Sequence, residues 1–112
     1  MAKSNIIMTT RMCGSKEKPE PYLLQFLEEV GFKKRFGRKI WEDEINGIKI
    51  SYTKKTDERM YKGKFEGYTY CLYITVEALD KEKAKPFIVK IEKWIEKMIK
   101  YHFGFYGGRA AL

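Results

Sequence analysis

The spacing of apolar residues between Asp80 and Phe103 constrains the fold of this chain more than any other feature of its sequence. Side chains of one stripe recur there every three or four residues, which is the repeat of an amphipathic helix. The stripe consists of Phe87, Ile88, Ile91, Trp94, Ile95, Met98, Ile99 and His102. Asp80 is suited to cap this helix. Pro86 fits either the first turn of a helix that begins near Lys85 or a kink in a longer helix. A helix with one apolar stripe must pack against a second layer.

A shorter helix is expected after Pro19 and Pro21. Proline suits the first turn of a helix, because the N–H group that it lacks would have no partner there. Gly31 suits the position just after the helix, where positive φ is common. The apolar face of this helix consists of Tyr22, Leu23, Phe26, Leu27 and Val30.

The remaining segments favour β-strands. Asn5 to Thr10 has the composition of a short buried strand, and Arg11 to Lys18 that of a polar loop. Tyr68 to Glu77 alternates apolar and polar side chains, as a strand with one buried face does. Met60 to Phe65 is compatible with a further short strand that turns at Glu66-Gly67.

Asn46-Gly47 predicts a tight hairpin. This pair favours a two-residue type I′ turn, because both turn positions need positive φ. A loop of two residues fixes the register of the flanking strands. The expected pairs are Ile45 with Ile48, Glu44 with Lys49, Asp43 with Ile50 and Trp41 with Tyr52. This register forms a Glu44–Lys49 ion pair on one face and places Asp43 on the apolar face.

The expected element order is therefore β-α-β-β-(β)-β-α. A chain of 112 residues is long enough for one core. We expect a single domain over residues 1–103, a two-layer α+β sandwich with a mainly antiparallel sheet of four or five strands and two amphipathic helices on one face. The uncovered face would present Lys49, Thr69, Tyr73 and Thr75. Residues 104–112, rich in glycine and aromatic residues, are expected to form a tail.

Composition excludes some classes of protein. A hydrophobic fraction of 44% with 7 Phe, 8 Tyr and 2 Trp excludes a disordered chain. Apolar runs are too short for a bilayer span, and the first residues lack a hydrophobic signal core, so a cytoplasmic location is expected. Cys13 and Cys71 lack the spacing of a zinc site, and we expect both to be reduced thiols.

The scarcity of side-chain amides suggests a thermophilic source. Asn5, Gln25 and Asn46 are the only amide side chains, whereas lysine and glutamate abound. Amides are lost chemically at high temperature, where ion pairs are less penalised by desolvation. A thermophilic archaeon, or a virus or plasmid of one, is the expected origin.

Positive charge points to a polyanionic partner. The chain has 23 Lys and Arg against 15 Asp and Glu, a formal net charge of +8. Five cations lie within residues 32–39, between a predicted helix and a predicted hairpin. Phe32 or Phe36 is available there to stack on bases. The equally weighted alternative is a solvated loop with Phe32 and Phe36 in the core.

The candidate nucleic-acid-binding residues follow from this loop and its surroundings. A second basic stretch contains Lys54, Lys55, Arg59, Lys62 and Lys64. The candidate site residues are Arg11, Lys33, Lys34, Arg35, Phe36, Arg38, Lys39, Lys54 and Lys55. Phosphate contacts by such lysines and arginines would give binding that weakens with salt.

Catalytic constellations are weak in this sequence. Asp43 with Glu58 or Glu77 lacks the spacing of a metal-dependent nuclease, and charge pairing is the favoured role of these acids. His102 is the only histidine, and its place near a helix end favours a capping or core-edge role. We assign no catalytic residue, metal ligand or cofactor, and the chain is expected not to be an enzyme.

Two local resemblances involve RNA-binding families. Ile6-Ile7-Met8-Thr9-Thr10-Arg11 resembles the first strand of Brix-type RNA-binding proteins. The expected α-β-β-β-α core, with Lys81-Glu82-Lys83-Ala84-Lys85 opening its second helix, is similar in layout to a double-stranded-RNA-binding domain, in which that helix start would bring lysines to phosphates. Pro86, the first strand and the bulky helix face depart from the latter family. The sequence identifies the chain as a member of neither.

These observations favour a small, non-enzymatic nucleic-acid-binding protein that contacts phosphates of RNA or DNA. The alternative is a viral or plasmid-borne inhibitor, a protein-interaction module that binds an acidic protein surface through the same cations. A metal-dependent nuclease ranks third. No membrane partner is expected, and the sheet row at Thr69 and Tyr73 is an alternative surface for a homodimer.

Overall fold

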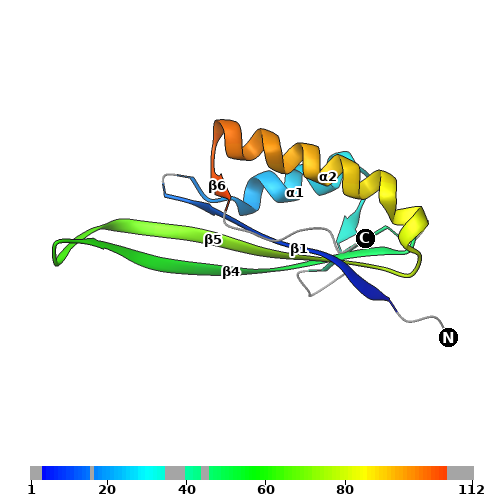
Figure 1. Cartoon of the computed structure of the whole chain (residues 1–112), viewed down its shortest axis with the longest axis horizontal. Coiled ribbons are helices and arrows are strands. Elements are labelled where there is room, and N and C mark those ends of the chain that lie inside the picture. The colour runs from blue at the N-terminus through cyan, green and yellow to red at the C-terminus, as the bar shows by residue number, and fades with distance from the viewer. Residues whose placement is uncertain (1–3, 16, 35–39, 44–45, 106–112) are drawn as a thin grey trace.

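The chain folds into two layers (Figure 1). The computed structural model describes residues 4–15, 17–34, 40–43 and 46–105. The elements are β1 (Asn5–Gly14), α1 (Glu20–Glu29), β2 (Lys33–Lys34), β3 (Ile40–Asp43), β4 (Ile48–Tyr61), β5 (Lys64–Ala78), α2 (Lys81–Tyr101) and β6 (Gly104–Phe105). The strands form an antiparallel sheet in the order β2-β3-β4-β5-β1-β6. Both helices lie on one face of it (Figure 1). The predicted α+β class and element order are confirmed.

Both helices begin where the sequence indicates. Pro19 occupies the N-cap of α1, and Gly31 follows its end with φ of +90°. The Asp80 carboxylate accepts a hydrogen bond of 2.9 Å from the backbone N–H of Glu82 and so caps α2. The helix continues through Pro86, as in the longer of the two predicted alternatives.

The core fills the space between the helices and the sheet. Its fully buried side chains come from both layers, among them Ile7, Met12, Leu23, Leu27, Ile50, Leu72, Ile74, Val76 and Ile91. Phe32 belongs to this core, with its ring centroid 4.8 Å from that of Phe87. Phe32 is therefore a packing residue and is not available to stack on a ligand.

Strand β1 is longer than predicted. Arg11, expected to open a polar loop, continues the strand and pairs with Tyr73. The reason is alternation, because Thr9, Arg11 and Cys13 occupy the face without helices, where polar side chains cost little. The strand ends at Gly14, where an added Cβ would overlap the Glu17 carbonyl oxygen and the Phe103 ring.

The predicted register of the first hairpin is wrong. Trp41 pairs with Ile50 and Asp43 with Ile48, whereas the prediction paired Trp41 with Tyr52 and Asp43 with Ile50. Asp43, at the end of β3, contacts Asn46. Its carboxylate accepts hydrogen bonds from the Asn46 backbone N–H (3.2 Å) and from Asn46 Nδ2 (2.7 Å). The expected ion pair of Lys49 with Glu44 falls partly outside the described residues, and Lys49 lies 3.7 Å from Glu77.

The longest feature of the fold is the β4–β5 hairpin. Its turn is at Lys62-Gly63, with φ of 50° and 77°, and not at Glu66-Gly67 as predicted. Residues 56–70, here called the arm, extend beyond the helices (Figure 1). At Glu66-Gly67 the ladder has an irregularity, since Arg59 pairs with Gly67 and Met60 with Phe65.

A disulfide joins Cys13 to Cys71, which corrects the prediction of two reduced thiols. The two residues are cross-strand partners in β1 and β5, with a Cα–Cα distance of 4.1 Å. They are 58 positions apart in the sequence, and only the unpredicted extension of β1 brings them together. The bond lies where the arm leaves the body of the sheet.

Candidate nucleic-acid interface

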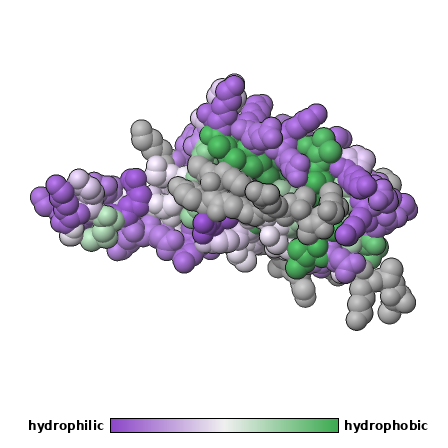
Figure 2. Space-filling view, in the orientation of Figure 1, coloured by the Kyte–Doolittle hydropathy of each residue, from purple (hydrophilic) through white to green (hydrophobic). Residues whose placement is uncertain are grey.

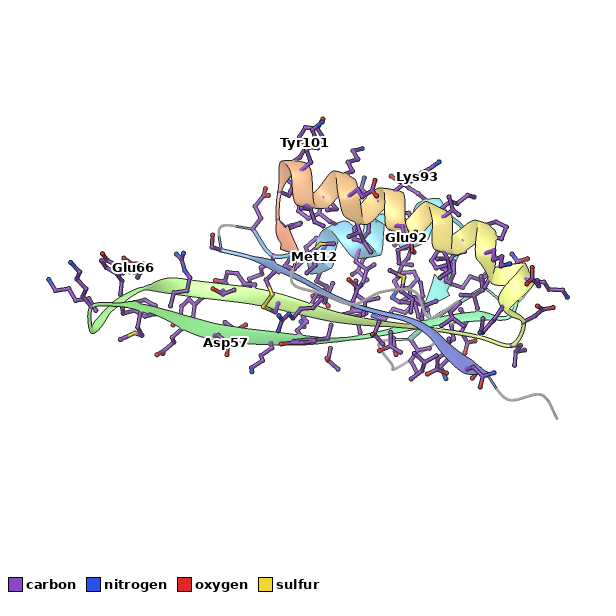
Figure 3. The ribbon with its side chains drawn as sticks, viewed as in Figure 1. Met12, Asp57, Glu66, Glu92, Lys93 and Tyr101 are labelled. Atoms are coloured by element: carbon purple, nitrogen blue, oxygen red, sulfur yellow. A yellow bond between two sulfur atoms is a disulfide. The ribbon has the colours of Figure 1, made fainter. Side chains whose placement is uncertain are left out.

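The sheet has one face that neither helix covers, here called the open face. Cross-strand partners share a face of a sheet, so the register gives its members. Its cations are Arg11, Lys33, Lys49, Lys55, Arg59 and Lys64, and its acids are Glu42, Asp57 and Glu77. The predicted row of Lys49, Thr69, Tyr73 and Thr75 lies on this face. Figure 3 shows Asp57 directed away from the helices.

Two contacts of the open face involve its cations. Lys55 Nζ lies 3.8 Å from the Asp57 carboxylate, and both side chains are more than half exposed. The Arg11 guanidinium lies 5.9 Å from the centre of the Tyr73 ring. Exposed ion pairs contribute about 0–1 kcal/mol. A phosphate group can therefore replace Asp57 as the partner of Lys55 at little cost.

The structure brings together part of the predicted site. Arg11, Lys33 and Lys55 share the open face, although β2 and β1 are four strand spacings apart, about 19 Å. Lys34 and Lys54 lie on the helix side of the sheet, since their cross-strand partners Trp41 and Leu72 are core residues. The other predicted residues, Arg35, Phe36, Arg38 and Lys39, lie outside the described residues.

Sequence reasoning did not identify the arm as a surface. Its large apolar side chains are exposed: Met60 by 57%, Tyr61 by 57%, Phe65 by 53% and Tyr68 by 43%. Figure 2 shows a mainly hydrophilic arm interrupted by a paler green patch. Lys62-Gly63 between two strand-like runs was the available signal, because such a pair permits a two-residue hairpin turn.

A hollow of about 160 Å³ lies at the root of the arm, on the helix side. Lys54 Nζ contacts the Glu20 carboxylate at 3.2 Å in its wall. Lys18 Nζ lies 5.2 Å from the centre of the Tyr70 ring. Burial, aided by a hydrogen bond with Glu20, raises the pKa of the neighbouring Tyr52 hydroxyl. The hollow thus combines three lysines, the Glu20 carboxylate and an aromatic ring.

A second polar cluster connects the end of α2 to the segment before α1. Glu17 accepts a hydrogen bond of 2.9 Å from the Tyr22 hydroxyl, and its other oxygen lies 2.9 Å from His102 Nδ1. These two hydrogen bonds, that of Tyr22 first, lower the pKa of Glu17. His102 is the C-cap of α2, which is the helix-end position that the sequence indicates.

The described residues contain no group of three or more His, Cys, Asp or Glu side chains that could hold a metal ion. Asp43, the acid considered for a nuclease, is engaged with Asn46. In the same described part of the chain, no helix has the length and apolar character needed to cross a bilayer. No family model, curated protein or solved structure matches this chain.

Proposed function

We propose that this protein binds nucleic acid through phosphate contacts on the open face of its sheet. The observation that carries the proposal is the gathering of Arg11, Lys33, Lys49, Lys55, Arg59 and Lys64 on one uncovered face. These cations outnumber the acids of the same face, which are Glu42, Asp57 and Glu77. Lysine and arginine on an exposed surface attract a polyanion and release its counterions on binding.

The hydroxyl groups of the open face support the same ligand. Ser51, Thr53, Thr75 and Thr9 lie between the cations, on β4, β5 and β1. Serine and threonine hydroxyls donate hydrogen bonds to phosphate oxygens and to sugars. A face of mixed cations and hydroxyls therefore offers both charge and directed donors to a nucleic-acid backbone.

The test is a charge-reducing variant with a matched control. Lys55→Gln, Arg59→Gln and Lys64→Gln together remove three cations from the open face. Lys90→Gln, Lys93→Gln and Lys97→Gln remove three exposed cations from α2, which packs on the opposite side of the sheet; Figure 3 shows Lys93 pointing away from that sheet. The first variant should weaken binding and lower the slope of log K against log salt by about 2 to 3.

The α2 variant has the same net charge and should change that slope by much less. Equal effects of the two variants would contradict an open-face site and indicate attraction by net charge alone. If the wild-type protein has no salt-dependent affinity for any nucleic acid, the proposed function fails, and an acidic protein surface becomes the ligand to test.

We also infer a thermophilic source, archaeal, viral or plasmid-borne. The support is the scarcity of amides together with the Cys13–Cys71 disulfide. Disulfides are rare in the cytosol of most organisms, but intracellular proteins of hyperthermophiles often contain them. A thermophilic source therefore reconciles the disulfide with the expected cytoplasmic location.

A further inference from the structure

The helix side of the arm has a row of aromatic rings that no described element covers. The ring centroids of Phe65 and Tyr68 are 5.1 Å apart, and those of Tyr68 and Tyr70 are 6.2 Å apart. We call these three residues the aromatic ladder. It continues the line of Leu72, Ile74 and Val76 on the same face of β5, where the helices cover the side chains. Beyond Tyr70 the helices end and the ladder lies in solvent (Figure 1).

The irregularity in β5 creates this arrangement. In a regular strand, residues three positions apart lie on opposite faces, so Phe65 would point away from Tyr68. The additional residue at Glu66-Gly67 shifts the alternation and brings the Phe65 ring to the Tyr68 ring. A bulge of this kind redirects side chains and commonly lies near functional sites.

A cation lies at the root of the ladder. Lys18 Nζ is 5.2 Å from the Tyr70 ring there, beside the hollow that Lys54 also lines. Lys62, in the turn at the tip, has its Nζ 5.4 Å from the ring of Tyr61, which pairs with Lys64 and so belongs to the open face. A row of rings with a cation at one end fits a ligand that alternates flat apolar groups with negative charges. A strand of nucleic acid has this chemistry.

We propose that the aromatic ladder stacks unpaired bases, so that the preferred ligand is a single-stranded nucleic acid. This inference rests on the proposed function and specifies its ligand, a strand that passes around the arm from the open face to the ladder on the helix side. In a duplex the bases present only their edges to a protein, whereas a single strand exposes base faces to aromatic side chains. The ladder offers rings for two or three bases, and Lys18, beside the Tyr70 ring, would contact a flanking phosphate.

Glu58 and Glu66 are acids near the middle of the ladder, whereas Glu20, at the root, is paired with Lys54. Glu58 is the cross-strand partner of Tyr68, and Figure 3 shows Glu66 on the helix side of the arm. A carboxylate repels phosphates but accepts hydrogen bonds from base amino groups. Glu58 and Glu66 therefore favour bases over phosphates at the middle of the ladder, and they place the backbone contact at the Lys18 end.

The experiment compares variants of exposed aromatic residues. Tyr68→Ala should weaken binding of a labelled single-stranded oligonucleotide by about tenfold, which is typical of one lost base stack. Tyr68→Phe keeps the ring and should bind like the wild type. Tyr101→Ala removes a more accessible ring, on α2, that is 63% exposed against 43% for Tyr68, and it should have no effect. Circular dichroism checks that each variant is folded.

The salt dependence separates this inference from the proposed function. Tyr68→Ala should leave the slope of log K against log salt unchanged, because the lost contact carries no charge. Wild-type binding that is equally tight for single strands and duplexes, or that is insensitive to Tyr68→Ala, would overturn the ladder inference while the open-face proposal stands. Absence of any salt-dependent binding would remove both.

Discussion

At the scale of single residues, Glu17 connects two separate parts of the chain through its carboxylate. Its carboxylate accepts from the Tyr22 hydroxyl and faces His102, so it joins the segment before α1 to the end of α2. Both hydrogen bonds favour the ionised carboxylate and lower its pKa. The cluster is therefore most stable when Glu17 is charged.

This cluster gives a pH dependence with a defined sign. Because the folded pKa of Glu17 is below its ordinary value, its stabilising contribution is present above the unfolded pKa and is lost as the pH falls through the folded pKa. A carboxyl-carbon NMR titration should give Glu17 a midpoint below 4.5. Tyr22→Phe removes the hydrogen bond that lowers the pKa of Glu17 most, and it should therefore raise that midpoint. A wild-type midpoint at or above 4.5 would contradict the cluster.

Single residues also explain the errors of sequence reasoning. Arg11 has the polarity of a loop residue, but a strand with one open face accepts arginine at every second position. Asp43 has no apolar character, yet it sets the hairpin connection through its hydrogen bonds to Asn46. Turn propensities of residue pairs such as Asn-Gly do not account for hydrogen bonds of this kind between a side chain and the nearby backbone.

At the scale of elements, the tip of the arm depends on two residues with positive φ. Gly63→Ala should destabilise the hairpin by about 1–2 kcal/mol, because a Cβ is strained at φ of 77°. Lys62→Asn should stabilise the hairpin, because asparagine tolerates positive φ better than lysine. Native-state hydrogen exchange should detect both changes at amides of the arm. Equal changes in the exchange rates of amides in the body of the sheet would contradict an effect that is local to the arm.

The disulfide belongs to the same scale, because it fastens β1 to β5 at the root of the arm. Closing a loop of 58 positions should stabilise the fold by about 4 kcal/mol in the loop-entropy approximation. Denaturant unfolding with and without reductant should detect this difference. The double variant Cys13→Ser, Cys71→Ser should have a stability close to that of the reduced wild type in both conditions and no response to reductant. Two titratable thiols in the unreduced, unfolded wild type would contradict the disulfide.

Helices and strands were predictable where a regular repeat of apolar residues continues over many consecutive positions. The three–four spacing of α2 and the alternation of Tyr68 to Glu77 specify their own structures, and both are present in the fold. The length of the β4–β5 hairpin was not predictable in this way. Its arm carries charges on both faces, including the consecutive residues Asp57 and Glu58, and so lacks the alternation that marks a half-buried strand.

At the scale of the whole molecule, the layers followed from the sequence but the site followed only in part. Two amphipathic helices and one alternating sheet permit few arrangements, so the two-layer sandwich was predictable. The face on which each cation lies depends on register, and a shift of one residue exchanges the faces. Lys33 and Lys55 therefore share a face with Arg11, whereas Lys34 and Lys54 do not.

The most direct test of backbone binding by the open face is fluorescence anisotropy of labelled single- and double-stranded RNA and DNA, titrated with the wild-type protein across a salt series. We expect a steep linear decrease of log K with log salt. We also expect a preference for single strands, because of the aromatic ladder. An affinity that does not change with salt, or no binding of any form, would contradict phosphate contacts on the open face and direct attention to an acidic protein partner.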